Sequence, residues 1–301
     1  PDSRLEKLAD IVAVDLNKET PFVANTSSRS LLGRPPIVPA IVKFVDIAGL
    51  VKGASEGAGL GNKFLSHIRE VNIVAHVVRA FEDDNIVKEG AVDPKTDYET
   101  IQTELILADL QTIQQAQSRI KRFQKQTEKD AIDKLFRGLN EGNPAKEIVL
   151  TPEEKEFAKT FFLLSAKPEI IVLNVSENDY SEKKFGSIYS RYTSIPGVEK
   201  EDGVIVCAKI ESELSELDVE EQKEYLDGLG LQASGLERLI QKSYKALGLI
   251  SFLTCGEKEV RAWTIEKGMK AVEAAGVIHT DFTKKFIKAE VVSYEDFVIL
   301  G

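Results

Sequence analysis

The chain has few cysteines, no long apolar run and no excess of basic residues, and each shortage excludes a class of protein. Its two cysteines, Cys207 and Cys255, lie outside any CxxC or histidine-rich spacing, which argues against a metal site and fits a reducing compartment. No apolar run approaches the roughly twenty residues that a membrane span needs. Acidic residues outnumber basic ones by 49 to 39, so a polycation that wraps nucleic acid is excluded, and any RNA contact must be local.

What the chain does contain is typical of a globular protein. It has 301 residues, of which 43% are hydrophobic and 29% are charged, enough for roughly two domains. The first residues, Pro1–Leu5, read as neither a signal peptide nor a basic transit segment. We therefore expect a cytoplasmic protein, with a mitochondrial location as the alternative if a preceding segment carries a transit peptide.

Short β-branched runs alternate with helical patterns along the first 250 residues. The runs are Ile41–Val45, which ends at Asp46, then Ile73–Val78, Ile170–Val175 and Val204–Cys207. Nearly continuous apolar strands separated by helices are typical of a parallel α/β sheet. Because such sheets gather their ligands at the carboxyl ends of the strands, we expect the loops after Asp46 and Val175 to lie at the same end.

Helical and small mixed segments complete the pattern. Residues 1–13 have helical spacing, and Ile106, Leu110, Ile113 and Ile120 form a seam of the coiled-coil type. The stretch Arg119–Arg137 has seven basic and three acidic residues, which fits either a solvated helix face or a local RNA contact. After Leu249, the alternating segments Glu259–Thr264 and Phe286–Val292 predict strands of a small α+β unit.

The motif that carries chemistry is Asp46-Ile47-Ala48-Gly49, which opens a loop rich in glycine. In a nucleoside triphosphatase, a carboxylate at this position holds Mg²⁺ through water, and the glycine N–H approaches the γ-phosphate. DxxG alone is an ordinary strand-to-loop turn. The unbroken stretch Asp46–Leu65, DIAGLVKGASEGAGLGNKFL, closely resembles the switch II region of the Obg-like ATPase (YchF) family, which belongs to the translation-factor-related P-loop NTPases.

The resemblance covers nearly the whole chain. Thr103–Leu110 resembles the entry into that family's coiled-coil insertion, and Lys258–Thr264 with Ala274–Phe282 is similar to its TGS domain. It implies an incomplete parallel sheet of the P-loop NTPase type with a helical coiled-coil insertion and a C-terminal β-grasp (TGS) domain. The implied domains are a nucleotide-binding (OBG-type G) domain at 1–103 and 153–250, the insertion at 104–152 and a truncated TGS domain at 251–301. The segment from about Asn17 to Pro39 is interpreted as an insertion.

A base-recognition site is implied by the same resemblance. Asn174-Val175-Ser176-Glu177 stands where GTPases have NKxD, whose Asp accepts hydrogen bonds from guanine, and Ala208 and Lys209 occupy the second base-side loop. Val175 and Glu177 alter the guanine-binding fork, which is consistent with the family's preference for ATP. Asn174 would meet an exocyclic amine or N7 of adenine. The predicted nucleotide-binding residues are therefore Asp46, Gly49, Asn174, Val175, Glu177 and Ala208, with Asp46 also at the metal, and the cofactors are ATP and Mg²⁺.

Departures from the family pattern concern hydrolysis. Leu50 stands where Ras-like enzymes have a glutamine that orients water, and the loop Asp84–Pro94 lacks the family's histidine. His67, His76 and His279 are interpreted as structural. No GxxxxGK[ST] phosphate loop is present; in the family it precedes a segment resembling Pro1–Leu8. No catalytic residue is therefore assigned, and we expect this chain to be inactive in ATP hydrolysis.

Two functions remain open at this stage. The first is an ATP-hydrolysing switch that binds the ribosome or ribosomal RNA through its coiled coil and TGS domain, with no membrane or DNA partner. The alternative is a non-hydrolysing ribosome- or RNA-binding module with a degenerate nucleotide site. The intact stretch Asp46–Leu65 favours the first, and the missing histidine and phosphate loop favour the second.

Overall fold

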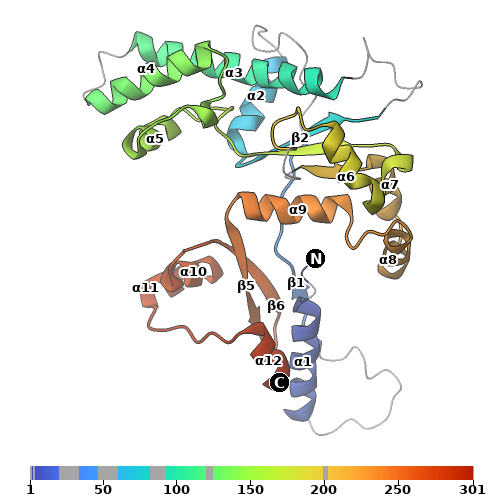
Figure 1. The fold of residues 1–301 in the computed structure, drawn as a ribbon. Coiled ribbons are helices and arrows are strands. Elements are labelled where there is room, and N and C mark those ends of the chain that lie inside the picture. The colour runs from blue at the N-terminus through green and yellow to red at the C-terminus, as the bar shows by residue number, and fades with distance from the viewer. Residues whose placement is uncertain are drawn as a thin grey trace. The chain divides into compact units, whose positions relative to one another are not determined.

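A computed structural model describes residues 2, 4–19, 34–46, 60–81, 93–119, 125–198 and 203–300, with the backbone alone for 14–19 and 60–64. The chain divides into two compact units, one formed by residues 1–44 and 247–301 and the other by residues 45–246 (Figure 1). Among the described helices, none is long and apolar enough to cross a membrane.

The larger unit contains the predicted parallel sheet. Its strands are β2 (Val74–Arg79), β3 (Glu169–Asn174) and β4 (Val204–Val206), in the order β2-β3-β4, and both pairings are parallel. The central strand β3 is buried from Ile170 to Leu173, as a run of consecutive apolar residues requires. The prediction of parallel strands at these three runs is confirmed.

The prediction of a further strand at Ile41–Val45 is wrong. Residues 41–46 form neither a strand nor a helix and pair with no described strand, and Ile41, Phe44 and Val45 are exposed. The short strand β1 (Ile37–Val38) lies just before them and belongs to the other unit. A β-branched run becomes a strand only where a neighbour completes its hydrogen-bond ladder, which the sequence pattern does not guarantee. On β2, Val77 is also 61% exposed, although Val78 is buried.

Helices surround the sheet and form an arm beside it. The bounds are α2 (Leu60–Glu70), α3 (Pro94–Ser118), α4 (Gln126–Asn140), α5 (Pro152–Lys159), α6 (Glu182–Arg191), α7 (Ala208–Leu214), α8 (Val219–Gly228) and α9 (Gly235–Ala246), with 3-10 turns η2 (Ala145–Glu147) and η3 (Glu177–Asp179). Local sequence sets several of these starts. Asp93 caps α3 before Pro94, and Thr151 and Glu154 form a capping box at α5.

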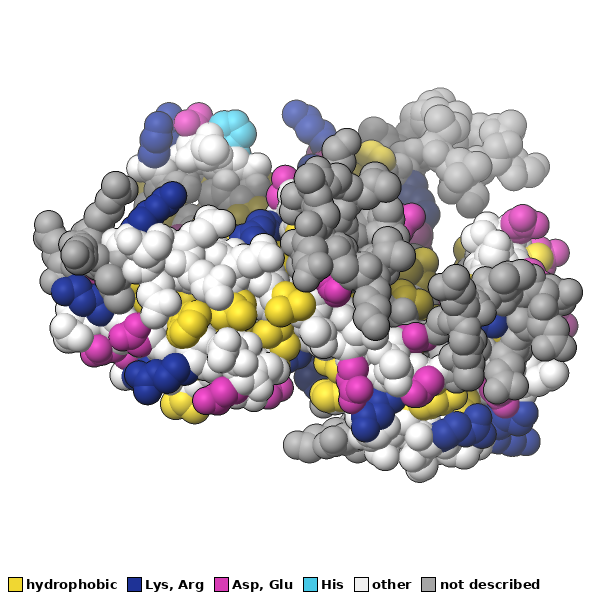
Figure 2. Space-filling view, turned by 90° about the horizontal axis from the view of Figure 1, so that it is seen from above, with side chains coloured by type: hydrophobic (Ala, Val, Ile, Leu, Met, Phe, Trp, Pro, Cys, Tyr) yellow, Lys and Arg dark blue, Asp and Glu magenta, His cyan; other side chains and the backbone are white. Residues whose placement is uncertain are grey.

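The arm consists of α3, α4 and α5 packed on one another. Ile106 and Ile113 of the predicted seam are buried in a cluster with Ile132 and Leu135 of α4, which agrees with the helical pattern. Ile120 lies outside the described residues. Lys134, one of the basic residues of the 119–137 stretch, contacts the buried Glu154 at 2.8 Å. On the face of the molecule drawn in Figure 2, Lys and Arg side chains are interspersed with Asp and Glu side chains.

The smaller unit is built on a hairpin. Strands β5 (Leu249–Cys255) and β6 (Val260–Glu266) are antiparallel, and β1 joins β6 in parallel. The unit's helices are α1 (Arg4–Glu19), α10 (Ala271–Ile278), α11 (Thr280–Lys285) and α12 (Tyr294–Leu300). Its core joins Leu5, Leu8 and Ala9 of α1 to Val260 and Ala262 of β6.

Two sequence expectations differ from this unit. Phe286–Val292 is not a strand, because Ile287 and Val291 are 91% and 87% exposed and the segment pairs with no described strand. Alternating polarity alone does not supply a neighbouring strand. The packing of α1 on β6 also groups residues 1–44 with the C-terminal unit, whereas the family resemblance predicts residues 1–103 in the nucleotide-binding domain. The functional domain boundaries remain a prediction.

Candidate functional site

The carboxyl edge of the sheet brings two of the predicted site residues together. Asn174 ends β3, and its side-chain oxygen accepts a hydrogen bond at 3.0 Å from the backbone N–H of Ala208, which begins α7 after β4. Only the amide oxygen of Asn174 can accept from an N–H, so this contact fixes the orientation of the amide. The Nδ2 group of Asn174 is left as a donor at the edge.

A second link joins the same two loops. Glu177 follows β3 in η3, and its carboxylate contacts the Lys209 ammonium at 2.7 Å. Both side chains are exposed, and the hydrogen bond that the Lys209 ammonium donates to Glu177 raises the pKa of Lys209. The loops that follow β3 and β4 are therefore tied by one backbone and one side-chain contact.

The other predicted residues are placed differently. Val175 is buried in the core beside Leu173, and its N–H donates to the Val206 carbonyl at 2.8 Å, so its side chain does not face a ligand. Asp46 is exposed and makes no hydrogen bond or ion pair with the described residues. Gly49 and the loop at Lys88 lie outside the described residues. The structure thus joins Asn174, Glu177 and Ala208 but does not join Asp46 to them.

Behind the edge lies a network that sequence reasoning missed. The Tyr180 hydroxyl donates to Glu211 Oε1 at 2.9 Å and accepts from Arg238 at 3.1 Å. Glu211 also accepts from the backbone N–H of Gly235, at the first residue of α9, at 2.6 Å. A Cβ at Gly235 would lie 2.7 Å from a Val206 side-chain carbon, so glycine permits this close approach. The network links α7 and α9 to the segment after η3, and no local motif announces it.

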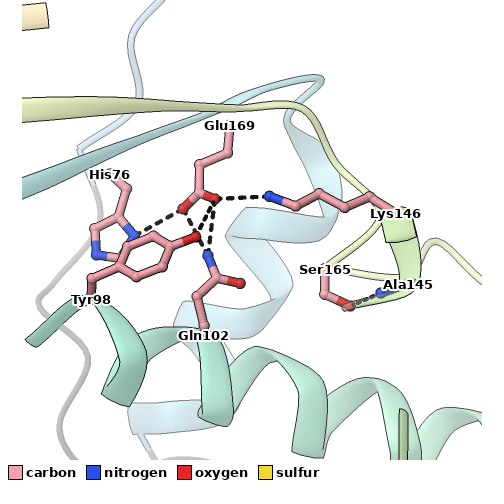
Figure 3. Close-up of polar contacts among 7 residues, drawn as sticks. All are labelled: His76, Tyr98, Gln102, Ala145, Lys146, Ser165 and Glu169. Atoms are coloured by element: carbon pink, nitrogen blue, oxygen red, sulfur yellow. Dashed lines mark hydrogen bonds and ion pairs between the residues drawn. The ribbon is translucent and has the colours of Figure 1, made fainter. Parts of the chain in front are cut away.

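The amino end of the sheet carries a denser cluster, shown in Figure 3, which we call the Glu169 cluster: His76, Tyr98, Gln102, Lys146 and Glu169. The Glu169 carboxylate contacts His76 Nδ1 at 2.9 Å, Gln102 Nε2 at 2.8 and 3.0 Å, Lys146 Nζ at 3.2 Å and the Tyr98 hydroxyl at 3.3 Å. Its side chain is 8% exposed. Although burial alone would raise the pKa of Glu169, the hydrogen bond from His76 and the charge of Lys146 hold it below its usual value.

This cluster connects the sheet to the helical arm. His76 belongs to β2, Tyr98 to α3, Lys146 to η2 and Glu169 to β3. The histidine is thus held inside a joint, in agreement with the structural role expected from the sequence. Nearby, hollows of about 470 and 560 Å³ flank Lys242 and Lys245 of α9, and neither is lined by Asn174, Glu177 or Ala208. The hollows therefore do not coincide with the edge, and the edge is preferred because the Asn174 amide nitrogen remains there as a hydrogen-bond donor next to the loops that follow β3 and β4.

Comparison with known proteins agrees with this architecture. The chain is 45% identical over 308 residues to the "Ribosome-binding ATPase YchF" of Bacillus subtilis (strain 168), with 100% of this chain and 79% of the relative covered. It is 41% identical over 305 residues to the protein of the same name from Escherichia coli O157:H7, with 99% of this chain and 78% of the relative covered.

A solved structure and a domain family match as well. "Structure of the Schizosaccharomyces pombe YchF GTPase" superposes with a TM-score of 0.78 at 34% identity and covers 99% of this chain and 77% of that chain. Residues 249–301 match the family YchF-GTPase_C, described as "Protein of unknown function (DUF933)". Because identity above 40% extends over almost the whole chain and more than three quarters of these curated relatives, the chain belongs to the YchF family of ribosome-binding ATPases.

Proposed function

We propose that this protein is an ATP-binding switch that associates with the ribosome, and that its base-recognition edge is formed by Asn174, Glu177 and Ala208. The observation that carries the proposal is the hydrogen bond from Ala208 N–H to the Asn174 oxygen. It locks together the loops after β3 and β4 at the end of a parallel sheet where α/β proteins bind ligands. The names of the relatives supply the ATPase and ribosome-binding roles.

The same geometry favours adenine over guanine. Asn174 Nδ2 is a donor and suits N7, an acceptor that both purines have. The Ala208 N–H already donates to Asn174, so it does not serve the guanine O6 acceptor. The Glu177 carboxylate is occupied by Lys209, which reduces its capacity to accept from guanine N1 and its amino group. Guanine is therefore disfavoured, because the two groups that would bind it are already engaged within the protein: the Ala208 N–H by Asn174 and the Glu177 carboxylate by Lys209.

Magnesium fits the proposal through Asp46. Mg²⁺ in nucleotide sites is held by one or two carboxylates together with substrate phosphates and water, rather than by a cage of protein ligands. Across the described ranges there is no group of three or more His, Cys, Asp or Glu side chains that would form such a cage. Asp46 is exposed and is thus available to hold the ion through water, while bound Mg²⁺ would neutralise phosphate charge.

The two candidate functions differ in whether the protein hydrolyses ATP. We expect a polypeptide of residues 1–301 to show no ATP turnover, because it has no GxxxxGK[ST] motif and Leu50 cannot orient water. A chimera that places a segment with the GxxxxGK[ST] phosphate loop expected of the family before Pro1 should bind ATP. If that chimera binds but does not hydrolyse, the non-hydrolysing binding module is the better description.

Competition binding to the chimera tests the base preference. ATP should bind more tightly than GTP, whereas a tenfold preference for GTP, about 1.4 kcal/mol, would refute the adenine assignment. Glu177→Asp is the variant of choice for shifting the preference toward GTP, since Val175 is in the core and a lysine there would bury a charge.

Ribosome association is tested separately by co-sedimentation of the 301-residue chain with ribosomes. We assign the contact to the arm, residues 104–152, and to the C-terminal TGS-like domain, residues 251–301. The hairpin β5–β6 followed by α10 is the order of elements expected of a β-grasp module. Loss of co-sedimentation on deletion of both segments, with the sheet unit still folded, is the expected result, and unchanged co-sedimentation would contradict the assignment.

A further inference from the structure

The hairpin of the smaller unit carries a ladder of aromatic and cationic side chains on one face. Phe252 of β5 pairs with Trp263 of β6, and their rings lie nearly parallel, 16° between planes and 6.5 Å between centroids. The Arg261 guanidinium lies over the Trp263 ring at 4.0 Å. Trp263 Nε1 donates a hydrogen bond to Thr254 Oγ1 at 2.9 Å, and this bond fixes the orientation of the indole. Thr254 is the residue of β5 that pairs with Arg261.

This face is distinct from the unit's core. Side chains alternate between the faces of a strand, and Val260 and Ala262 face the core formed with α1. Arg261 and Trp263 therefore lie on the opposite face, where the Arg261 side chain is 38% exposed and Ile250 is 43% exposed, Phe252 and Trp263 are half-buried and Ile265 is buried. Figure 1 shows α10 and α11 on the side of the hairpin away from α1, and α11 ends in Lys284 and Lys285.

The chemistry of the ladder suits one class of ligand. A planar guanidinium held over an indole offers a flat cationic surface, and unpaired bases stack on arginine planes and aromatic side chains of sheet surfaces. Such stacking accepts any base, because every base has a π-face. Glu259 approaches Arg261 only at 3.6 Å in an exposed pair, which constrains the guanidinium little. A partner helix would instead need a continuous apolar stripe.

We propose that Arg261, Trp263 and Phe252 form a stacking platform for an unpaired base of single-stranded RNA. The inference rests on the proposed ribosome association and deepens it by naming the residues and the kind of RNA.

Trp263 is the single tryptophan of the chain, so its fluorescence reports on the platform directly. The 301-residue chain is titrated with a ten-nucleotide oligoadenylate RNA and with an abasic strand of the same length. Saturable quenching by the RNA, with at least about fivefold weaker binding of the abasic strand, is expected because each stacked base contributes appreciably. No quenching, or equal affinity for both strands, would overturn the proposal.

Four variants, one of them a control, separate stacking from charge and from folding. Arg261→Gln and Arg261→Lys should both weaken binding of fluorescently labelled RNA at least about fivefold, because lysine keeps the charge but loses the plane. Lys258→Gln, in the turn of the same hairpin, is the matched control and should change affinity less than twofold. Trp263→Phe keeps an aromatic ring and should retain most of the binding in anisotropy measurements. If Arg261→Lys binds like the parent chain, the platform is refuted.

Ribosome co-sedimentation of the same variants keeps the two proposals apart. If the parent chain sediments with ribosomes but the RNA strand does not quench Trp263, the platform fails and the proposed function stands. If Arg261→Gln weakens sedimentation without any RNA quenching, a protein surface is the partner and the RNA assignment is overturned. If the parent chain never sediments with ribosomes, the proposed function fails, whatever the strand shows.

Discussion

The polar side chains at the two ends of strand β3 differ in how fully they are hydrogen-bonded within the protein. At the amino end, Glu169 is nearly buried and its oxygens contact four side chains. At the carboxyl end, Asn174 is half-buried, one side-chain group is held by Ala208 and the other is left as a donor. The strand between them is apolar and buried. A saturated polar group serves the fold, whereas a partly engaged one at an exposed edge is available to a ligand.

The two ends of β3 also have partners from different parts of the chain. The Glu169 cluster draws on β2, α3 and η2, and so joins the sheet to the arm. Within the part of the chain that the structure describes, the Asn174 edge draws on the loops after β3 and β4. Mutations at the first end should therefore affect folding, and mutations at the second should affect nucleotide binding.

The largest expected effect is loss of stability at the amino end. Glu169→Ala should lower the free energy of unfolding by about 3 to 5 kcal/mol, because it leaves His76, Gln102 and Lys146 facing a buried vacancy. Urea unfolding followed by circular dichroism measures this. The neighbouring exposed Glu147→Ala is the matched control and should change stability by less than about 0.5 kcal/mol. Equal losses in both variants would contradict the assigned role of the cluster.

A smaller effect on stability is expected at the carboxyl end. Two substitutions of Asn174 separate its contribution to stability from its contribution to ATP binding. Asn174→Ala removes the acceptor for Ala208 N–H and should cost about 1 kcal/mol of stability. Asn174→Asp keeps that acceptor but replaces the outward donor, so it should leave stability nearly unchanged. Both should weaken ATP binding by the chimera about tenfold, since a donor to the base is lost. If Asn174→Asp binds ATP normally, the edge does not contact the base.

The pH dependence of stability sharpens the comparison further. Because the folded protein holds the pKa of Glu169 below its ordinary value of about 4.3, the carboxylate stabilises the fold above that value. This contribution is lost as the pH falls below about 4.3 toward the folded pKa. Glu169→Gln should therefore show a smaller drop in unfolding free energy between pH 7 and pH 3 than the parent chain. Denaturant midpoints at several pH values check the difference.

The sequence predicted the three parallel strands because their apolar runs are long and β-branched, and this signal is local. It failed at Ile41–Val45 and Phe286–Val292, because whether an extended run is a strand depends on a neighbour that the pattern does not contain. The resemblance to a family located Asn174 and Ala208, which the structure joins. It did not reveal Glu169, Tyr180 or Glu211, whose importance comes from contacts between distant segments.

The smallest expected effect on stability concerns Lys209. Its ammonium contacts Glu177 at 2.7 Å, but both side chains are largely exposed, and exposed pairs contribute little to folding because water screens them. Lys209→Gln should leave the urea midpoint unchanged within error. Its effect should appear in base choice instead, since the freed Glu177 carboxylate regains its capacity to accept from guanine. The ratio of GTP to ATP affinity of the chimera should therefore rise, and the increase should be absent when Glu177→Gln is combined with Lys209→Gln. A change in stability with no change in this ratio would place Lys209 with the Glu169 cluster, as a residue of the fold rather than of the site.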